Sequence, residues 1–508
     1  HLYLCCLRPE RKVFAGRRQQ PCFGDIKTTT NMNKGKMTNF RWVICAMLFF
    51  ATTVNYLDRQ VLSLTWDEFI KPEFHWNEIN YGNITGLFAI VYAIAQLFAG
   101  RIVDRLGTKK GYAVAIGVWS LGACVHALCG LATEAYIGVG SRLELVQATG
   151  DMAVAISTFS VYMFMFARCV LALGEGGNFP SAIKATAEYF PKKDRAFATS
   201  IFNSGASIGA LVAPLTIPVL AAKFGWEMAF LIIGALGFVW MGFWVFIYKK
   251  PSESKHVNAE ELAYIEQDAS LDAEYAKKNE AETDGGKMGI FQCLKHRQAW
   301  AFILARFFTD GVWWFFLFWT PSYLNTQFGI KTSDPAGIAL IFTLYLITML
   351  SIFGGKLPTI FINRTGKDPY TCRTRAMLIF ALIPLVVLLA QPLGQISPLF
   401  PVICIGLGGA AHQSWSANLY TVGTDMFPKK AAATITGICG MAAGLSSFMF
   451  QKVAGHLFVY AGETNLRFLG FEGKPAGYFI IFCFCAVAYI LGWTAMKALA
   501  PKYEPISE

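Results

Sequence analysis

The stretch Phe190-Pro191-Lys192-Lys193 returns 237 positions later as Phe427-Pro428-Lys429-Lys430. Residues around the two copies also match at this offset: Glu188 and Asp425, Thr199 and Thr436, and Ile201 and Ile438. A single four-residue repeat could arise by chance. A repeat in equivalent loops, between helices rich in small residues, indicates a chain built from two related halves.

Both halves consist of long apolar segments. Hydrophobic residues make up 55% of the 508 residues and charged residues 15%, whereas soluble proteins carry about 25% charged residues. A membrane-spanning helix needs about 20 mostly apolar residues. The predicted spans are 41–66, 81–103, 111–132, 156–180, 196–221, 227–249, 299–325, 335–362, 374–392, 398–424, 431–456 and 475–498. This pattern predicts an all-α polytopic membrane protein and excludes a soluble enzyme.

The spans fall into two groups of six, separated by the polar connection 250–298. We expect residues 37–249 to form an N-terminal half of six transmembrane helices, and 299–508 a pseudo-symmetric C-terminal half. The connection between them is predicted to be a solvated cytoplasmic linker. Residues 1–36 look like a non-native or disordered extension. The insertion at about 133–155 is predicted to face outside, with no function evident from its sequence.

Charge is distributed unevenly along the chain. The net charge is +11, but the basic residues collect in every second connection between spans, which is the positive-inside pattern. This pattern places both termini in the cytoplasm and gives no reason to expect a nucleic-acid partner. Most of the 13 cysteines lie inside apolar runs without metal-ligand spacing, so we interpret them as packing residues and predict no metal site.

One loop carries a recognisable signature. Gly100, Asp104, Arg105 and Gly107 lie between the second and third spans, followed by Lys109 and Lys110. This loop resembles the signature cytoplasmic loop of the major facilitator superfamily, with Thr108 where arginine is usual. The resemblance implies a cytoplasmic gate motif; the alternative is a plain basic loop. Two related halves also imply a binding site at their interface near the bilayer midplane.

Four ionisable residues lie deep inside predicted spans, where each costs at least about 2.5–3.5 kcal/mol to insert. They are Asp58 and Arg59 in the first span and Arg168 and Glu175 in the fourth. Arg168 and Glu175 are two helical turns apart and share a face, about 10 Å from each other. Asp58 and Arg59 point about 100° apart. We expect an Asp58–Arg168 pair, which leaves Arg59 for an anion or for Glu175. The alternative is that all four charges only hold helices together.

Other polar and aromatic residues could line the same cavity. They are Tyr56, Tyr92, Asn203, Trp313, His412, Ser416 and Asn418. His412 lies at the repeat offset from Glu175 and either titrates or is held neutral by a hydrogen bond. Ser416 and Asn418 point in opposite directions by helical spacing, so they cannot bind the same group. Arg306 and Asp310, four residues apart, can satisfy each other.

Three segments together resemble the anion:cation symporter family, and its bacterial hexuronate transporters in particular. These segments are 55–59 (Asn-Tyr-Leu-Asp-Arg), 173–180 (Leu-Gly-Glu-Gly-Gly-Asn-Phe-Pro) and 190–195 with 202–205. The resemblance implies a proton-coupled symporter that imports a sugar-acid anion, most simply glucuronate or galacturonate, by alternating access. Asp58 and Glu175 would then be the protonating carboxylates, and Arg59 and Arg168 their basic partners.

The same resemblance implies a monomer in a bacterial inner membrane, with H⁺ as the coupling ion and no cofactor. An aldonate such as galactonate, another organic anion, or sodium coupling stay open as alternatives. A membrane-embedded enzyme or sensor is the alternative from a different class. The sequence contains no HExxH motif, Walker-type loop or output domain that would favour it.

Overall fold

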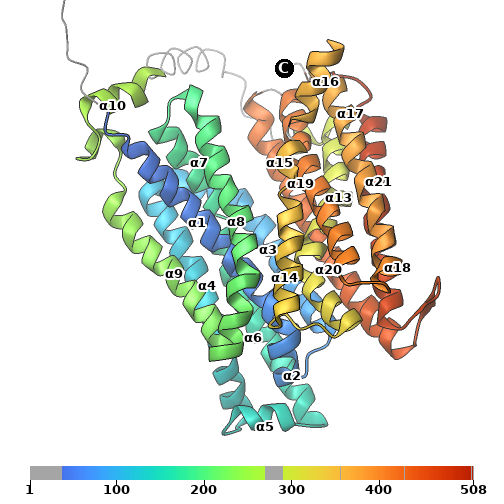
Figure 1. The fold of residues 1–508 in the computed structure, drawn as a ribbon. Helices are drawn as coiled ribbons and strands as arrows, with labels where there is room; N and C mark the ends of the chain where they lie inside the picture. Colours follow the sequence, from blue (N-terminus) through green and yellow to red (C-terminus); the bar gives the residue numbers. More distant parts are fainter. Residues whose placement is uncertain (1–36, 269–289, 355, 428, 505, 507–508) are drawn as a thin grey trace, which may run out of the picture.

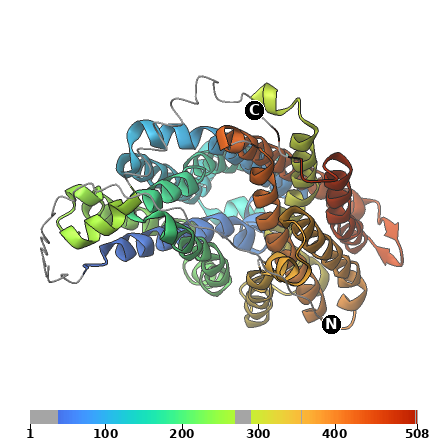
Figure 2. The ribbon, with the colours of Figure 1, turned by 90° about the horizontal axis from the view of Figure 1, so that it is seen from above.

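The computed structural model describes residues 37–268, 290–354, 356–427, 429–504 and 506. The predicted extension 1–36 lies outside these residues, as does part of the linker. The described chain is helical apart from one short hairpin of strands β1 (Arg467–Phe468) and β2 (Phe471–Glu472). Figures 1 and 2 show two sets of helices side by side, the first blue to green and the second yellow to red.

The N-terminal half begins with a long helix that continues through a π-helical turn. Its elements are α1 (Phe40–Thr65), η1 (Trp66–Ile70), α2 (Lys71–Phe74), α3 (Glu78–Leu106), α4 (Thr108–Ile137), α5 (Arg142–Gln147), α6 (Asp151–Glu175), α7 (Asn178–Tyr189), α8 (Lys192–Phe224) and α9 (Trp226–Ile247). The described part of the linker contains η2 (Pro251–Glu253), α10 (Ala259–Ile265) and η3 (Glu266–Asp268).

The C-terminal half is more broken. Its elements are α12 (Ile290–Cys293), α13 (Arg297–Phe328), α14 (Pro335–Thr348), α15 (Ser351–Gly354), α16 (Leu357–Thr365), α17 (Pro369–Leu382), η4 (Ile383–Leu389), α18 (Ala390–Gly394), α19 (Leu399–Met426), α20 (Lys429–Glu463) and α21 (Lys474–Leu499). Among the described residues, nine helices are long and apolar enough to cross a membrane, and Pro335–Thr348 is a shorter apolar helix.

Every predicted span falls on a helix or on consecutive helices. Three spans predicted as continuous are interrupted. Span 156–180 crosses the turn at Gly176 and Gly177 between α6 and α7. Span 335–362 breaks into α14, α15 and α16, and span 374–392 passes through the 3-10 segment η4, which begins next to Pro384. Proline lacks an amide donor and disfavours the α conformation of the preceding residue. The repeated motif starts equivalent helices, because α8 begins at Lys192 and α20 at Lys429.

The halves contact each other mainly through α3 against α20, and also through α8 against α14. Two glycines permit the close approach of α3 and α20. A Cβ on Gly82 would lie 2.5 Å from the backbone oxygen of Gln451, and a Cβ on Gly455 would lie 2.5 Å from that of Glu78. A larger residue at either position would push the two halves apart.

Polar contacts also join the halves at the end of the bundle that holds α2 (Figure 1). The amide of Ser333 donates to Glu68 at 3.1 Å, and Asn325 donates to Asp67 at 2.9 Å. Lys474 forms an ion pair with Glu78 at 2.6 Å. These contacts tie the end of α13, the loop that follows it and the start of α21 to η1 and the start of α3.

At the opposite end, the linker helix α10 caps α1. Glu261 is fully buried and accepts hydrogen bonds from the amides of Phe40 and Arg41, at 2.9 and 3.1 Å, and from the Thr38 hydroxyl at 2.5 Å. It also forms an ion pair with Arg41 at 3.1 Å. A carboxylate at a helix N-terminus satisfies free amides and favours the helix dipole. The start of the linker is therefore anchored on the N-terminal half.

The predicted gate motif forms the tight turn between α3 and α4. Gly107 has φ of +77°, a backbone conformation that favours glycine. Arg105 is exposed in the last turn of α3. The side chain of Asp104 lies outside what the structure describes, so the role of the motif as a gate stays a prediction.

Candidate functional site

The centre of the site is an ion pair between α1 and the end of α6. Arg59 donates from Nε and Nη2 to the same oxygen of Glu175, Oε2, at 2.9 and 2.6 Å. Both residues are almost completely buried. The other oxygen, Oε1, is buried with no hydrogen-bond partner among the described residues. The sequence left Arg59 either for an anion or for Glu175, and in this structure it binds Glu175.

Glycines on both sides of Glu175 hold it in place. A Cβ on Gly174 would fall on the backbone of Trp119 in α4, and a Cβ on Gly176 would lie 2.8 Å from Cβ of Ala95 in α3. The chain at the junction of α6 and α7 therefore packs against two helices at once. This close packing fixes the depth of the carboxylate and explains why glycines surround it in the sequence.

Aromatic rings surround the guanidinium of Arg59. Its Cζ lies 5.0 Å from the ring centre of Tyr56, 4.7 Å from Tyr92 and 5.8 Å from Phe88. The fourth ring, at 5.1 Å, is Trp314 of α13. Trp314 belongs to the C-terminal half, so Arg59 stands where the two halves meet. Cations over aromatic faces within about 6 Å are attracted to the ring.

Asp58 does not form the predicted pair with Arg168. Its two carboxylate oxygens are buried and have no hydrogen-bond partner among the described residues. Asp58 still lies within electrostatic range of Arg168 and Glu175. The Arg168 guanidinium is instead turned toward the backbone oxygen of Arg59, which explains why the predicted hydrogen-bonded pair does not form.

Arg168 is also largely unpaired. Its Nη2 donates to the backbone oxygen of Arg59 at 3.5 Å, while Nε and Nη1 are buried without partners among the described residues. Its Cζ lies 5.2 Å from the ring of Phe88. Arg168 therefore contacts the backbone at Arg59 and is buried with Asp58 and Glu175. We name these four residues the charge cluster.

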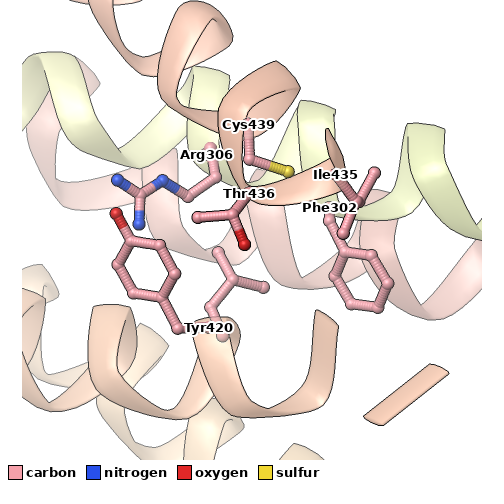
Figure 3. Close-up of a pocket in the computed structure, with 7 residues that line it drawn as sticks. Phe302, Arg306, Tyr420, Ile435, Thr436 and Cys439 are labelled. Atoms are coloured by element: carbon pink, nitrogen blue, oxygen red, sulfur yellow. The ribbon is translucent and has the colours of Figure 1, made fainter. Parts of the chain in front are cut away.

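The C-terminal half contributes a second polar group. Arg306 and Asp310 form the predicted ion pair, with Nη2 2.5 Å from Oδ2. Arg306 also donates to Ser416 of α19 at 3.3 Å, and its Cζ lies 4.3 Å from the ring centre of Tyr420. Figure 3 shows this guanidinium beside the Tyr420 hydroxyl.

Tyr420 borders this group on α19. Its ring lies against the Arg306 guanidinium, and the residue is 43% exposed although it belongs to a central helix. Together with Arg306 it lines a cavity between α13, α19 and α20.

Three of the residues predicted to bind the substrate have their contacts within the C-terminal half: Trp313, His412 and Asn418. His412 stacks on Trp313 with ring centres 5.4 Å apart, and its Nδ1 lies 2.8 Å from the Tyr489 hydroxyl, so both rings pack within the C-terminal half. Asn418 donates to the Ser414 oxygen of its own helix. Ser416 and Asn418 thus have different partners, as their spacing predicts.

Asn203 is exposed on α8, and no contact connects it to Arg59 among the described residues. Phe88, Trp314 and Tyr420 were missing from the sequence prediction. Tyr420 follows Ser416 by one helical turn, so it shares the face of a residue already named, which is a signal that could have identified it. Nothing in the sequence distinguishes Trp314 from Trp313.

Comparison with known proteins gives the family. The sequence pattern of the Major Facilitator Superfamily matches residues 48–451. The chain is 30% identical to the hexuronate transporter of Escherichia coli K12 over 437 residues. This aligned region covers 85% of this chain and 90% of that protein. It is 30% identical over 328 residues to the galacturonate transporter of Dickeya chrysanthemi, covering 64% and 84%.

A solved structure agrees on the fold. The D-xylose-proton symporter superposes with a TM-score of 0.62 at 14% identity, covering 89% of this chain and 97% of that one. The match to the Major Facilitator Superfamily spans most of this chain. The structure of this chain also has two helical halves with a charged site between them. This chain belongs to the Major Facilitator Superfamily.

Proposed function

We propose that this protein is a proton-coupled symporter that moves a sugar-acid anion, a hexuronate such as galacturonate or glucuronate, by alternating access. The observation that carries the proposal is Arg59, a buried cation enclosed by aromatic rings from both halves. A planar guanidinium matches a carboxylate with two parallel hydrogen bonds. The relatives named for hexuronate and galacturonate support the sugar-acid class.

The charge cluster supports coupling to protons. Its two arginines and two carboxylates have formal charges that cancel. An anion can bind Arg59 only if Glu175 releases it, and a proton on Glu175 removes the competing charge. An ionised carboxylate without a partner is costly to bury, so Asp58 is the natural second proton acceptor. Uptake of a proton thus opens the cation to the substrate.

The rest of the site supports a polyhydroxylated substrate. Tyr56 and Tyr92 place hydroxyls beside Arg59, and Ser416 and Tyr420 place two more on the facing half. Hydroxyls can donate to or accept from the ring hydroxyls of a sugar acid, while the aromatic faces contact its carbon skeleton. A carrier of apolar anions would not need so many neutral polar groups.

Membrane orientation follows from charge. We propose that the α10 end and both chain termini face the cytoplasm of a bacterial inner membrane, in accord with the basic loops. The polar contacts around Glu68 and Glu78 then join the two halves at the outer end. We further propose that the protein works as a monomer, with no cofactor besides the coupling ion.

Reconstitution tests the proposal. Uptake of labelled galacturonate into proteoliposomes with acid outside and choline in place of sodium should exceed uptake into protein-free liposomes. Unlabelled uronates should compete, whereas neutral hexoses and glutamate should not. A neutral hexose that competes as well as its uronate contradicts the role of Arg59. Uptake that requires sodium contradicts proton coupling.

A further inference from the structure

The ion pair Arg306–Asp310 has a feature that the charge cluster lacks. Both partners are on α13, one helical turn apart, and both are buried. Rocking of the halves leaves residues of a single helix in place, so this pair persists throughout a transport cycle. The positive charge of Arg306 is therefore compensated in every state. In contrast, Arg59 and Glu175 belong to different helices.

Arg306 nevertheless retains hydrogen-bonding capacity toward a cavity. Its Nε is buried with no partner among the described residues. A small cavity lies beside it. Its lining includes Phe302, Arg306, Tyr420, Ile435, Thr436 and Cys439 (Figure 3). A polar group in this cavity can therefore reach a charge-compensated guanidinium.

The helix that carries Arg306 and Asp310 also reaches the site at Arg59. Trp314 follows Asp310 by one turn of α13 and lies on the same face. The ring centre of Trp314 is 5.1 Å from Cζ of Arg59. A six-carbon acid whose carboxylate is held at Arg59 thus extends its far end toward Arg306 and Asp310.

The far end distinguishes two classes of sugar acid. In the ring form of a hexuronate, this end is the anomeric carbon with its hydroxyl. In an aldarate it is a second carboxylate. A hydroxyl suits the pair, because it can accept from Arg306 and donate to Asp310. A second carboxylate meets Asp310, and like charges that are brought together away from water disfavour binding.

We propose that Asp310 is a specificity-determining residue that restricts the carrier to sugar acids with one carboxylate, because it keeps Arg306 charge-compensated. This inference rests on the proposed transport of sugar acids. It predicts that removing the charge of Asp310 frees Arg306 to bind a second carboxylate. Asp310→Asn should therefore gain affinity for aldarates, a gain that misfolding cannot produce.

The test is competition of labelled galacturonate uptake by unlabelled galactarate and galacturonate in proteoliposomes. Wild-type protein should prefer galacturonate by at least about tenfold, which corresponds to 1.4 kcal/mol. Asp310→Asn should reduce this preference by at least about tenfold, and the added change Arg306→Gln should restore it. The matched control is Asp368→Asn at the exposed N-cap position before α17, where asparagine can also cap the helix, and it should match the wild type.

The outcomes separate the two proposals. No galacturonate uptake by wild-type protein overturns the proposed function. Uptake of galacturonate with equal inhibition by galactarate overturns the role of Asp310 without any variant. An unchanged preference in folded Asp310→Asn, judged by its elution as a single species in detergent, overturns it as well.

Discussion

Asp58 and Arg59 are adjacent on α1 but have opposite electrostatic environments. Arg59 is held by two hydrogen bonds to Glu175, whereas both carboxylate oxygens of Asp58 are without a partner among the described residues. The 100° between successive helical residues separates them, with Arg59 facing the second half and Asp58 facing the interior of the first. Substitutions at the two carboxylates of the charge cluster should therefore have different effects.

Asp58→Asn should not lower the melting temperature of the detergent-solubilised protein, because the Asp58 carboxylate accepts no hydrogen bond from the described residues and is costly to bury as an ion. Glu175→Gln should lower it, because it leaves Arg59 uncompensated, a defect that typically costs about 3–5 kcal/mol. Thermal unfolding measured side by side tests the contrast. A larger loss of stability in Asp58→Asn than in Glu175→Gln would refute the assignment of partners.

Glu175→Gln should also uncouple transport from protons. The amide cannot take up a proton, so accumulation driven by a pH gradient should fall to background, while counterflow of preloaded galacturonate survives. The control is Glu253→Gln, an exposed residue of the linker. If gradient-driven accumulation survives intact in Glu175→Gln, Glu175 has only a structural role.

Arg59→Lys should weaken substrate binding. Lysine keeps the charge but loses the planar pair of donors. A hydrogen bond to a charged group contributes about 1.5–3 kcal/mol, so affinity should fall about 10- to 100-fold. Inhibition of uptake by graded galacturonate gives the affinity, with Arg101→Lys as an exposed control on α3. Wild-type affinity in Arg59→Lys would exclude a direct contact with the carboxylate.

The contact between the linker and α1 should depend on pH. Burial raises the pKa of Glu261, but the Thr38 hydroxyl, the amides of Arg41 and Phe40 and the Arg41 guanidinium outweigh it and hold this pKa below its ordinary value. The contact is therefore fully stabilising above the ordinary glutamate pKa of about 4.3. It is lost as the pH falls through the lowered value.

Hydrogen exchange of the first turn of α1 measures this contact. Protection of residues 40–44, corrected for intrinsic exchange rates, should fall on acidification in the wild type. It should be low at every pH in Glu261→Gln. The exposed neighbour Glu260 provides the matched control Glu260→Gln. Equal protection in both variants would show that Glu261 does not anchor α1.

Much of the fold could be predicted from the sequence because apolar length and loop charge follow from bilayer physics. The Arg306–Asp310 pair was also predictable, since side chains at i and i+4 of one helix are close enough to form an ion pair. Pairing across helices was not, because the direction of Asp58 on α1 does not tell which neighbouring helix it faces. For the same reason Trp313 was chosen over Trp314, whose ring is the one that lies against Arg59.

The breaks in the C-terminal half were also missed. The run 335–362 is apolar enough for one helix, yet it is interrupted between α14 and α15 and again before α16. At the end of α15 the chain packs tightly on α19, because a Cβ on Gly354 would lie 2.0 Å from Oγ of Ser414. Such contacts depend on tertiary packing, which composition does not report.

The most direct test of the account is the pH of a weakly buffered, sodium-free suspension of proteoliposomes when galacturonate is added outside. Proton symport through the charge cluster predicts an immediate rise of external pH in the wild type and none in Glu175→Gln. It also predicts no rise when a neutral hexose replaces galacturonate. Galacturonate uptake without any rise in external pH would contradict the central claim.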